Sequence, residues 1–323
     1  MTMAEGRELD VDAILTGVGD DLPDGHRAGM VGLVGRPNTG KSTLLNHLVA
    51  EKVAIVTEVP GTTRNAIRGV LTRADAQLVF LDTPGLAKPR TLLTQRLNAL
   101  VRETWEGVDL ICFLVDVAAG VGPGDRFLAG ELAGVDTPIV AVANKVDLVR
   151  PKERMLPELE RLAALLGDDR EFDAIVPVSA TTGDNVDHLI DVLVDRLPEA
   201  PRLLPPDAVS DQPEHQLAAE ILREKLIGQV QDELPHSIAV TVESIDEDDD
   251  RDDLLRVDAV IHVERESQKP IVIGRDGAGL KAAATAARHE LEVLLGAKVY
   301  LSTHVRVAKE WQRDAKQLGR LGY

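Results

Sequence analysis

The sequence predicts an α/β domain with a doubly wound, mostly parallel sheet, followed by a smaller α+β domain. Its length of 323 residues is more than one hydrophobic core usually fills. Short aliphatic runs alternate with helical patterns in the first part of the chain, and a different order of elements follows. A proline-rich stretch at 201–213 separates the two patterns, as a stiff linker would. We therefore expect domains at 28–200 and 214–323.

Five aliphatic runs in the first domain are expected to form buried strands. Continuous Val, Ile and Leu runs are typical of a parallel sheet that is covered on both faces. The stretches between them have helical spacing, which gives repeated βα units with right-handed crossovers. The expected strands are residues 31–35, 78–81, 110–115, 139–143 and 175–178, and the expected helices include residues 42–50, 95–108, 158–166 and 186–197.

Composition narrows the class of protein. The apolar fraction of 44% and the charged fraction of 28% are ordinary for a soluble globular protein. The acidic segment 1–27 lacks the features of a signal peptide, and no apolar run is long enough to span a membrane. We expect that segment to be a disordered extension and the protein to be cytoplasmic. The single cysteine, Cys112, lies in an apolar run and is expected to be a core residue.

The second domain has the predicted order α-β-β-α-β, with a further helix at 311–318. The predicted elements are a helix at 214–232, strands at 238–245 and 254–263, an alanine-rich helix after a glycine turn, and a strand at 298–307. The acidic stretch 246–253 is predicted to be a solvated loop between two antiparallel strands. A divalent-metal site is the alternative for that stretch, although it lacks the glycine and terminal glutamate of an EF-hand.

A complete phosphate-binding motif follows the first predicted strand and precedes a predicted helix. The glycines let backbone N–H groups surround a phosphate at a helix N-terminus, where the helix dipole also favours negative charge. Lys41 is expected to neutralise the β- and γ-phosphates, and Ser42 to ligate Mg²⁺. The residues expected to line this part of the nucleotide site are Gly35, Arg36, Pro37, Asn38, Thr39, Gly40, Lys41, Ser42 and Thr43.

Asn144, Lys145 and Asp147 form an N-K-x-D motif after a buried strand. The Asp147 carboxylate can accept two N–H bonds from guanine, whereas adenine lacks the exocyclic amine at that place, so this residue selects GTP. Asn144 can bond the base or brace the loop, and the Lys145 stem can cover the base plane. Ser179 and Ala180, after the next strand, can offer a backbone N–H to guanine O6.

Asp82, Thr83, Pro84 and Gly85 form a D-x-x-G motif between the two motifs above, and this order resembles that of TRAFAC-type GTPases. The resemblance implies that Asp82 holds Mg²⁺ through water and that the Gly85 N–H senses the γ-phosphate. Residues 60–64 resemble the first switch of these enzymes, in which a threonine ligates Mg²⁺ only while the γ-phosphate is present. We favour Thr63 over Thr62 for this role.

Leu86 occupies the place where Ras-like enzymes carry a water-positioning glutamine, so unaided hydrolysis is expected to be slow. GTPases with an apolar residue there and an asparagine at the place of Asn38 resemble K⁺-activated enzymes, which makes Asn38 a candidate K⁺ ligand. The alternative for Asn38 is an amide that stabilises the local turn. The predicted catalytic residues are thus Lys41, Thr63, Gly85 and Asn38, and the predicted Mg²⁺ ligands are Ser42, Thr63 and Asp82.

Gly274, Arg275, Asp276 and Gly277 form a G-x-x-G sequence inside the α-β-β-α-β order. That combination resembles the type II KH module, whose G-x-x-G loop clamps single-stranded nucleotides by their backbone. Lys281 follows on the next helix and is a further candidate for RNA contact. Residues 298–320 hold six lysines and arginines against two acids, so this segment is basic although the whole chain carries a net charge of −18.

With residues 263–269, 280–281, 287–288, 299–301 and 318–323 added, the pattern is similar to that of the Era family of GTPases over roughly residues 28–323. Pro270 and the long acidic stretch are departures that touch no phosphate-binding position. The resemblance implies GTP and GDP with Mg²⁺ as ligands and a monomer that binds no DNA. It also implies binding to the 3′ end of 16S rRNA and a function in assembly of the 30S ribosomal subunit.

Two other functions remain open on the sequence. One is a regulator of cell division at the inner face of the membrane, because related GTPases associate peripherally with membranes and the C-terminal segment is basic. The other is a tRNA-modification GTPase, which shares the 60–64 and 82–85 patterns but lacks a KH-like domain.

Overall fold

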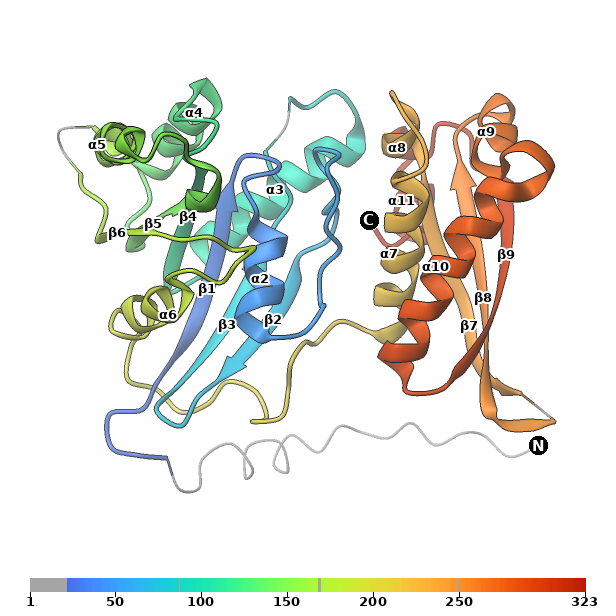
Figure 1. The fold of residues 1–323 in the computed structure, drawn as a ribbon, viewed down its shortest axis with the longest axis horizontal. Helices are drawn as coiled ribbons and strands as arrows, with labels where there is room; N and C mark the ends of the chain where they lie inside the picture. The colour runs from blue at the N-terminus through green and yellow to red at the C-terminus, as the bar shows by residue number, and fades with distance from the viewer. Residues whose placement is uncertain (1–21, 87, 168–169, 249) are drawn as a thin grey trace.

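The first domain is built on a six-stranded sheet in the order β2-β3-β1-β4-β5-β6 (Figure 1). The computed structural model describes residues 22–86, 88–167, 170–248 and 250–323. Only β2 runs antiparallel to its neighbour, β3; the other paired strands are parallel. The strands are β1 (Arg27–Gly35), β2 (Ile67–Thr72), β3 (Ala76–Asp82), β4 (Leu110–Asp116), β5 (Ile139–Asn144) and β6 (Ala174–Pro177).

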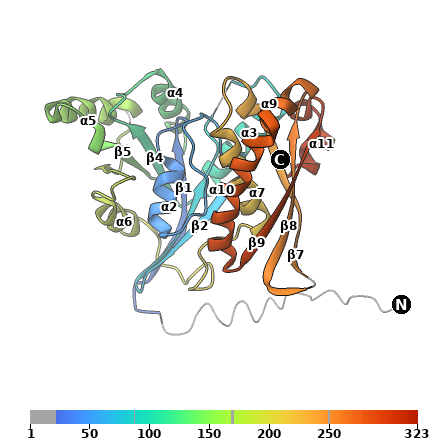
Figure 2. The same cartoon turned by 45° about the vertical axis from the view of Figure 1, so that its right-hand side comes forward.

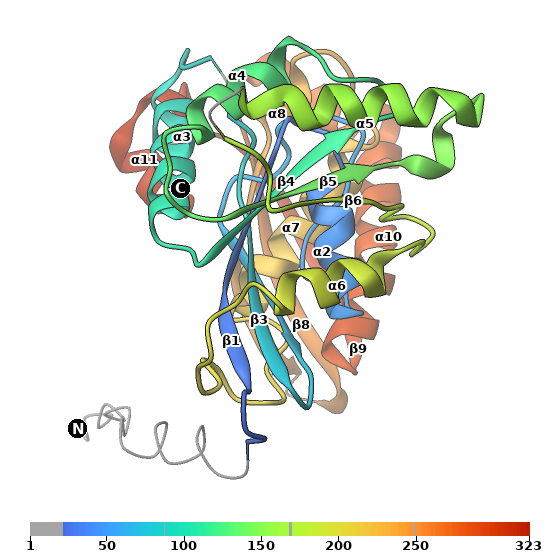
Figure 3. The same cartoon turned by 90° about the vertical axis from the view of Figure 1, so that its left-hand side faces the viewer.

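Helices cover both faces of this sheet, as the continuous aliphatic runs predict (Figure 3). The helices α2 (Lys41–Val49) and α6 (Val186–Val194) share one apolar core with the sheet. A second core on the opposite face joins the sheet to α3 (Leu92–Glu106), α4 (Pro123–Leu132) and α5 (Met155–Ala163). Cys112 is fully buried on β4, as predicted, and burial raises the pKa of its thiol to about 12.

The second domain is a three-stranded sheet with two long helices on one face (Figure 2). The strands β7 (Ala239–Asp248) and β8 (Arg251–Val263) are antiparallel, and β9 (Lys298–Val307) pairs parallel to β8. The long helices are α7 (Glu214–Ile227) and α10 (Ala278–Leu295), and the short helices are α8 (Leu234–Ser237), α9 (Lys269–Ile273) and α11 (Ala315–Arg320).

The segment between the domains is hydrogen-bonded to the first domain at several points. The backbone N–H groups of Leu203 and Leu204 donate to the Gln77 side chain at 2.7 and 2.9 Å. The Val70 N–H donates to the Val209 carbonyl at 2.8 Å. Since these contacts are made by residues from two different strands, they fix the direction in which the linker leaves the first domain.

The structure corrects the expectations for several local elements. The apolar residues before the G-x-x-G sequence form the short helix α9, an element that the predicted order did not include; Pro270 occupies its first turn and Gly274 ends it. The helix predicted at 214–232 ends at Ile227. The acidic stretch is not a simple loop: β7 continues to Asp248, which is buried and pairs with Arg256. The remaining loop is short because both strands continue into the stretch.

Two further differences lie in the first domain. The pattern of aliphatic runs missed the edge strand β2, which contains Arg68, Gly69 and Thr72 and therefore does not form a continuous apolar run. The predicted extension 1–27 mostly falls outside the described residues, but Arg27 already begins β1 and the His26 side chain contacts the Ala200 carbonyl. The described part of the chain contains no helix that is long and apolar enough to cross a membrane.

Candidate functional site

Parallel pairing brings the three nucleotide motifs together at one edge of the sheet. The phosphate-binding segment follows β1, the D-x-x-G segment follows β3 and the N-K-x-D segment follows β5. The carboxyl ends of parallel strands form the ligand-binding edge of open α/β sheets. A cleft of about 300 Å³ lies at this edge. It is lined by Pro37, Asn38, Gly40, Lys41, Ser42, Thr43, Ile55, Val56, Thr57, Glu58, Gly61, Thr62, Thr63, Gly85 and Lys145.

The turn before α2 requires glycine at position 40. Gly40 has a φ of +97°, and a Cβ there would lie 2.3 Å from the Asn144 side-chain nitrogen. A larger residue would therefore open the turn and displace the N-K-x-D loop. Lys41 is buried in the turn, and its Nζ donates to the carbonyls of Gly35 at 3.0 Å and Arg36 at 3.2 Å. Burial lowers the pKa of Lys41, and the nearby Asp82 carboxylate opposes that shift.

Three oxygen-bearing side chains predicted to hold Mg²⁺ gather at the start of α2. Ser42 Oγ donates to Asp82 Oδ2 at 2.6 Å and lies 3.3 Å from Thr63 Oγ1. Asp82 is fully buried, and burial raises the pKa of its carboxyl. Its Oδ1 atom has no hydrogen-bond partner among the described residues, which is an expensive state for a buried carboxylate oxygen. Hydroxyl and carboxylate oxygens with a free acceptor fit a hydrated Mg²⁺ ion.

The two switch threonines differ in what their hydroxyl groups contact. Thr62 Oγ1 donates to the Val59 carbonyl at 2.7 Å and lies 2.5 Å from Thr57 Oγ1, so it is committed within its own segment. Thr63 Oγ1 instead points to Ser42. Of the two hydroxyl groups, only that of Thr63 therefore faces the Ser42 side chain.

Asn144 braces the nucleotide edge rather than presenting a free amide. Its Nδ2 donates to the Thr39 carbonyl at 2.7 Å, and its Oδ1 accepts from the N–H groups of Lys145 at 2.8 Å and Ala180 at 3.0 Å. One buried side chain thus joins three loops. Because Asn144 already accepts the Ala180 N–H, and Ser179 donates its own N–H to Asp184, both groups predicted for guanine O6 have partners within the chain.

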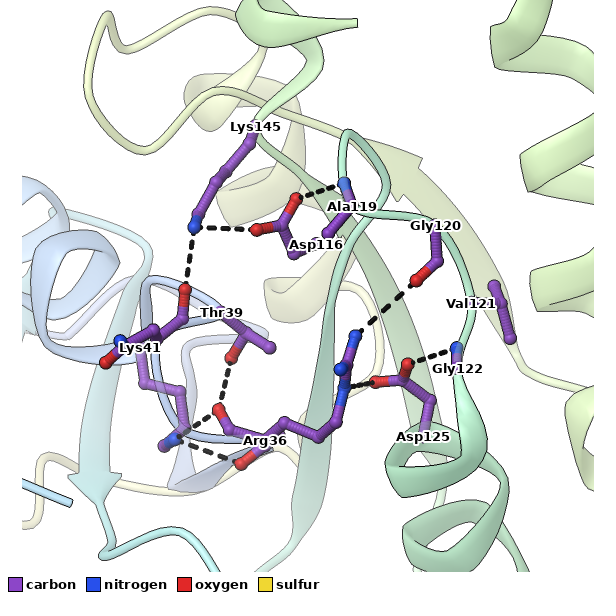
Figure 4. A network of polar contacts seen from close by, with 12 residues as sticks. Arg36, Thr39, Lys41, Asp116, Ala119, Gly120, Val121, Gly122, Asp125 and Lys145 are labelled. Carbon is purple, nitrogen blue, oxygen red and sulfur yellow. Dashed lines mark hydrogen bonds and ion pairs between the residues drawn. The ribbon is translucent and has the colours of Figure 1, made fainter. Parts of the chain in front are cut away.

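Lys145 is held over the phosphate-binding segment by two contacts (Figure 4). Its Nζ donates to the Asn38 carbonyl at 2.7 Å and forms an ion pair with Asp116 Oδ2, also at 2.7 Å. These contacts hold the aliphatic stem where it lines the cleft. Asp147 is half-buried in the next turn and makes no hydrogen bond or ion pair within the part of the chain that the structure describes, so its carboxylate is available.

Two residues that the sequence reasoning missed support this arrangement (Figure 4). Asp116 ends β4 and accepts from the N–H groups of Ala118 and Ala119 while it pairs with Lys145. Arg36, predicted only as a lining residue, pairs with the fully buried Asp125 at 2.7 Å and so ties the phosphate-binding segment to α4. Asp116 could have been predicted, because it is an acidic residue that directly follows the expected strand 110–115, and that strand ends at the ligand-binding edge. No local sequence pattern indicates Asp125.

The remaining predicted residues lie around the same cleft. A Cβ on Gly85 would approach the Pro37 ring at 3.0 Å, which keeps the D-x-x-G segment close to the phosphate-binding turn. Thr83 is buried and donates to the Leu33 carbonyl at 3.2 Å. Asn38 has a φ of 64°, and its side chain donates to the Glu58 carbonyl of the switch segment at 2.7 Å. Leu86 packs against the apolar core and offers no hydrogen bond.

In the second domain, the G-x-x-G sequence forms the turn between α9 and α10. Gly274 and Gly277 both have a φ of 76°, and a Cβ on Gly274 would lie 2.8 Å from the Gly279 nitrogen. A Cβ on Gly277 would meet open space, so a backbone could approach there. The side chains of Arg275, Asp276 and Lys281 are exposed beside the turn.

The basic C-terminal segment contributes to a second cleft, of about 240 Å³, beside α11. Arg306, Lys309 and Arg320 line it together with His262. Burial and then the charges of Arg306 and Arg320 lower the pKa of His262 to about 4, so this imidazole is neutral at neutral pH. The three cations that line the cleft make this part of the surface locally basic, in contrast to the strongly acidic chain as a whole.

The comparisons with known proteins follow this division into two domains. A family model described as a 50S ribosome-binding GTPase matches residues 30–145, and a KH-domain model matches residues 233–312. The GTPase Era of Mycolicibacterium smegmatis is 50% identical over 299 residues, which cover 92% of this chain and 99% of that protein. The chain belongs to the Era family of GTPases.

The Era-family assignment confirms the resemblance and the fold class that the sequence predicted. Another relative, the GTPase Era of Mycobacterium tuberculosis, is 51% identical over 299 residues, covering 92% of this chain and 98% of that protein. A solved Era structure in complex with MgGDPNP and nucleotides 1506–1542 of 16S ribosomal RNA has a TM-score of 0.88 at 37% identity. An Aquifex aeolicus Era variant bound to GDP.AlF4- has a TM-score of 0.87, also at 37% identity. Each covers 92% of this chain and 99% of the solved chain.

Replacing the bracing amide of this Era-family GTPase tests the geometry of the site. We expect Asn144→Ala to weaken both GTP and GDP binding by about 10-fold to 100-fold, because three hydrogen bonds of about 1 kcal/mol each hold the loops together. Isothermal titration calorimetry with each nucleotide would measure this. Gln77→Ala is the matched control: it removes a buried amide with several bonds to the linker, and it should lower stability without changing nucleotide affinity. Equal losses in the two variants would contradict a specific role for Asn144.

Proposed function

We propose that this Era-family GTPase is a switch whose GTP-bound form binds the 3′ end of small-subunit ribosomal RNA and acts in assembly of the 30S subunit. The observation that carries the proposal is the pairing of a complete nucleotide edge with a glycine turn suited to an RNA backbone. The Era protein solved with MgGDPNP and 16S ribosomal RNA nucleotides matches over both domains, which supports a similar use of this chain. We further propose a monomer that acts in the cytoplasm and binds no DNA.

In the proposed GTP-bound state, each residue of the first domain has a separate task. Lys41 exchanges its contacts with the Gly35 and Arg36 carbonyls for the β- and γ-phosphates. Ser42, Thr63 and, through water, Asp82 would hold Mg²⁺, and the ion would supply positive charge that neutralises the phosphates. The Gly85 N–H contacts the γ-phosphate, so loss of that group releases the segment that follows.

Base recognition is assigned to the available carboxylate at the same edge. Asp147 accepts from the N1 and N2 positions of guanine, and Lys145 covers one face of the base. Asn144 contributes by holding the loops rather than by bonding the base, since its amide is already committed. The guanine O6 contact from Ala180 requires that its N–H be shared between Asn144 and the base.

RNA binding is assigned to the turn between α9 and α10. Open space over Gly277 admits a phosphate backbone, and the cations of Arg275 and Lys281 lie beside it. The basic cleft at Arg306, Lys309 and Arg320 adds positive potential on the same domain. Nucleic-acid affinity grows with the number of phosphates neutralised, so the argument rests on the cations at this turn and cleft, because residues 214–323 as a whole are net acidic, like the full chain.

The choice between the two switch threonines can be tested by a matched pair of variants. We expect Thr63→Val to reduce the affinity for a non-hydrolysable GTP analogue in Mg²⁺ by about tenfold, because a ligand to the ion is lost, and to leave GDP affinity unchanged. Thr62→Val should leave both affinities unchanged, because its hydroxyl bonds only within its own segment. Fluorescent nucleotides titrated with and without Mg²⁺ provide the measurement. The reverse result would assign the role to Thr62.

We also propose that K⁺ stimulates hydrolysis through Asn38. Leu86 cannot position the attacking water, so another group must stabilise the charge that develops in the transition state. We expect GTP turnover in KCl to exceed that in NaCl of equal ionic strength by at least about tenfold, and Asn38→Ala to abolish the difference. If the wild-type protein turns over equally in both salts, Asn38 serves only to hold the Glu58 carbonyl.

RNA recognition is tested by adding a negative charge at the glycine turn. Gly277→Asp should weaken binding to an oligonucleotide with the 3′-end sequence of small-subunit rRNA by about tenfold, through repulsion of its phosphates, while nucleotide affinity is retained. Gly296→Asp is the control, because Gly296 also has a positive φ with open space around it but lies at the far end of α10. Fluorescence anisotropy in the presence of GDP or the GTP analogue measures both effects.

The same titrations decide the wider proposal. We expect the 3′-end oligonucleotide to bind more tightly with the GTP analogue than with GDP. It should also bind more tightly than an oligonucleotide of scrambled sequence. Wild-type affinity in the Gly277 variant would contradict the assignment of the turn. Binding of neither oligonucleotide in either nucleotide state would contradict the RNA switch altogether.

A further inference from the structure

Two buried arginines cross the boundary between the domains in opposite directions. Arg64, in the first domain, is 4% exposed and donates to the carbonyls of Ile238 at 2.7 Å and His236 at 2.8 Å. Arg223, on α7 of the second domain, is fully buried and donates to the Thr62 carbonyl. Each domain therefore holds a backbone segment of the other by a charged donor, and such bonds are stronger than neutral ones.

The contacts of Arg223 explain why it can be buried there. Its guanidinium makes a two-fold contact with Glu220 one turn earlier on α7, and this carboxylate provides the balancing charge. Burial opposes the charge, yet the pairing with Glu220 raises the pKa of Arg223, so the group remains a cation. The pair is thus built within α7 and presents a fixed donor to the switch segment.

Arg64 is held by backbone and aromatic groups rather than by a paired carboxylate. Its guanidinium lies 5.3 Å from the Trp311 ring centroid and 5.6 Å from that of Tyr323, and these two rings stack on each other at 5.5 Å. The Tyr323 carbonyl accepts from Arg96 on α3 at 2.8 Å. Figure 3 shows this C-terminal end beside α3, so the aromatic pair is itself anchored to the first domain.

These two anchors flank the residue proposed to ligate Mg²⁺. The carbonyl that Arg223 binds belongs to the peptide group joining Thr62 to Thr63, so this bond fixes the peptide plane before Thr63. The next residue is Arg64, whose side chain is fixed in the second domain. Thr63 is therefore held on both sides, with its hydroxyl 3.3 Å from Ser42 Oγ.

We propose that Arg223 and Arg64 are positioning residues for binding of GTP with Mg²⁺, through which the C-terminal domain sets the place of Thr63 at the Mg²⁺ site. The inference rests on the proposed role of Thr63. It assigns a part of the GTPase site to a domain none of whose described residues lines the nucleotide cleft. By linkage, a ligand that strengthens the contact of Thr63 with Mg²⁺ stabilises the contact between the domains by the same free energy.

The test is the effect of Arg223→Met on nucleotide preference, since methionine keeps much of the apolar length but removes the donors. We expect the affinity for a fluorescent, non-hydrolysable GTP analogue in Mg²⁺ to fall by about tenfold, because a charge-assisted hydrogen bond is lost. GDP affinity should remain within about twofold, and the difference should disappear when Mg²⁺ is removed by chelation. Arg223→Lys, which retains a cationic donor, should restore part of the preference.

A second variant guards against failure of the first to fold. Arg223→Met leaves the Glu220 carboxylate without its partner, so the double variant R223M/E220Q removes both charges together. Thermal unfolding monitored by circular dichroism checks that each variant is folded. Lys52→Met is the matched control. Lys52 pairs with Glu224 on α7 and Glu290 on α10, so its loss weakens the same boundary without touching the switch segment.

The outcomes separate this inference from the proposed role of Thr63. If Thr63→Val lowers the preference for the GTP analogue and Arg223→Met has no further effect in that background, both ideas are supported, because coupled residues are not additive. If Thr63→Val alone has the effect, the positioning role of Arg223 is wrong. If Thr63→Val has none, the proposed switch ligand is wrong. Equal loss of GTP and GDP affinity in R223M/E220Q, or the same selective loss in Lys52→Met, would overturn the positioning role.

Discussion

The carboxyl ends of β1, β3 and β5 meet at one edge of the sheet, and this constraint decides where every nucleotide-binding group lies. Parallel pairing places residues more than 100 positions apart next to each other, as the 2.7 Å contact of Asn144 with Thr39 illustrates. Asn144 converts that proximity into a rigid arrangement, because a single side chain bonds three loops. Gly40 then has to be glycine, since any side chain there would occupy the space of the Asn144 amide. The local turn and the global sheet thus impose the same geometry.

Buried charge is concentrated where phosphate and Mg²⁺ are proposed to bind. Lys41 and Asp82 are both buried, and burial shifts the pKa of each toward its neutral form while each opposes the shift of the other. A free carboxylate oxygen on Asp82 and a lysine that contacts only backbone carbonyls are costly in a folded core. A bound cation would pair with the free oxygen of Asp82, and a bound anion would pair with Lys41. The free-energy cost of burying these two groups would then be recovered when a metal–phosphate ligand binds.

The two domains are connected through the segment that carries Thr63, the proposed switch ligand. Arg64 and Arg223 form polar contacts across the boundary, whereas Leu93, Trp311, Leu318 and Leu321 form a small apolar cluster between α3 and the C-terminal segment. The apolar cluster favours association without fixing a single geometry, since such packing is not directional. The arginine contacts are directional and attach to the backbone next to Thr63. This combination suits a boundary that persists while its switch segment moves.

The sequence by itself determined the local chemistry of this protein. The phosphate-binding turn, the other two nucleotide motifs and the glycine turn of the second domain each consist of residues that are close in the chain, so their spacing identifies them. Elements without a continuous pattern were missed: β2 is an edge strand whose apolar residues are interrupted by Arg68 and Gly69, and the short helix α9 between β8 and the glycine turn was not predicted.

Only the tertiary structure decided which groups of the site are committed and which are available. Asn144 and Ala180 were both predicted to belong to the nucleotide site, yet they bond each other. Asp116 and Asp125 form ion pairs that support the site, although neither belongs to a sequence motif. The contact of Arg223 with Thr62 joins residues 161 positions apart in different domains. Such pairings follow from how whole domains pack, because a buried guanidinium bonds whatever carbonyl the packing brings to it, and no local pattern of residues encodes that choice.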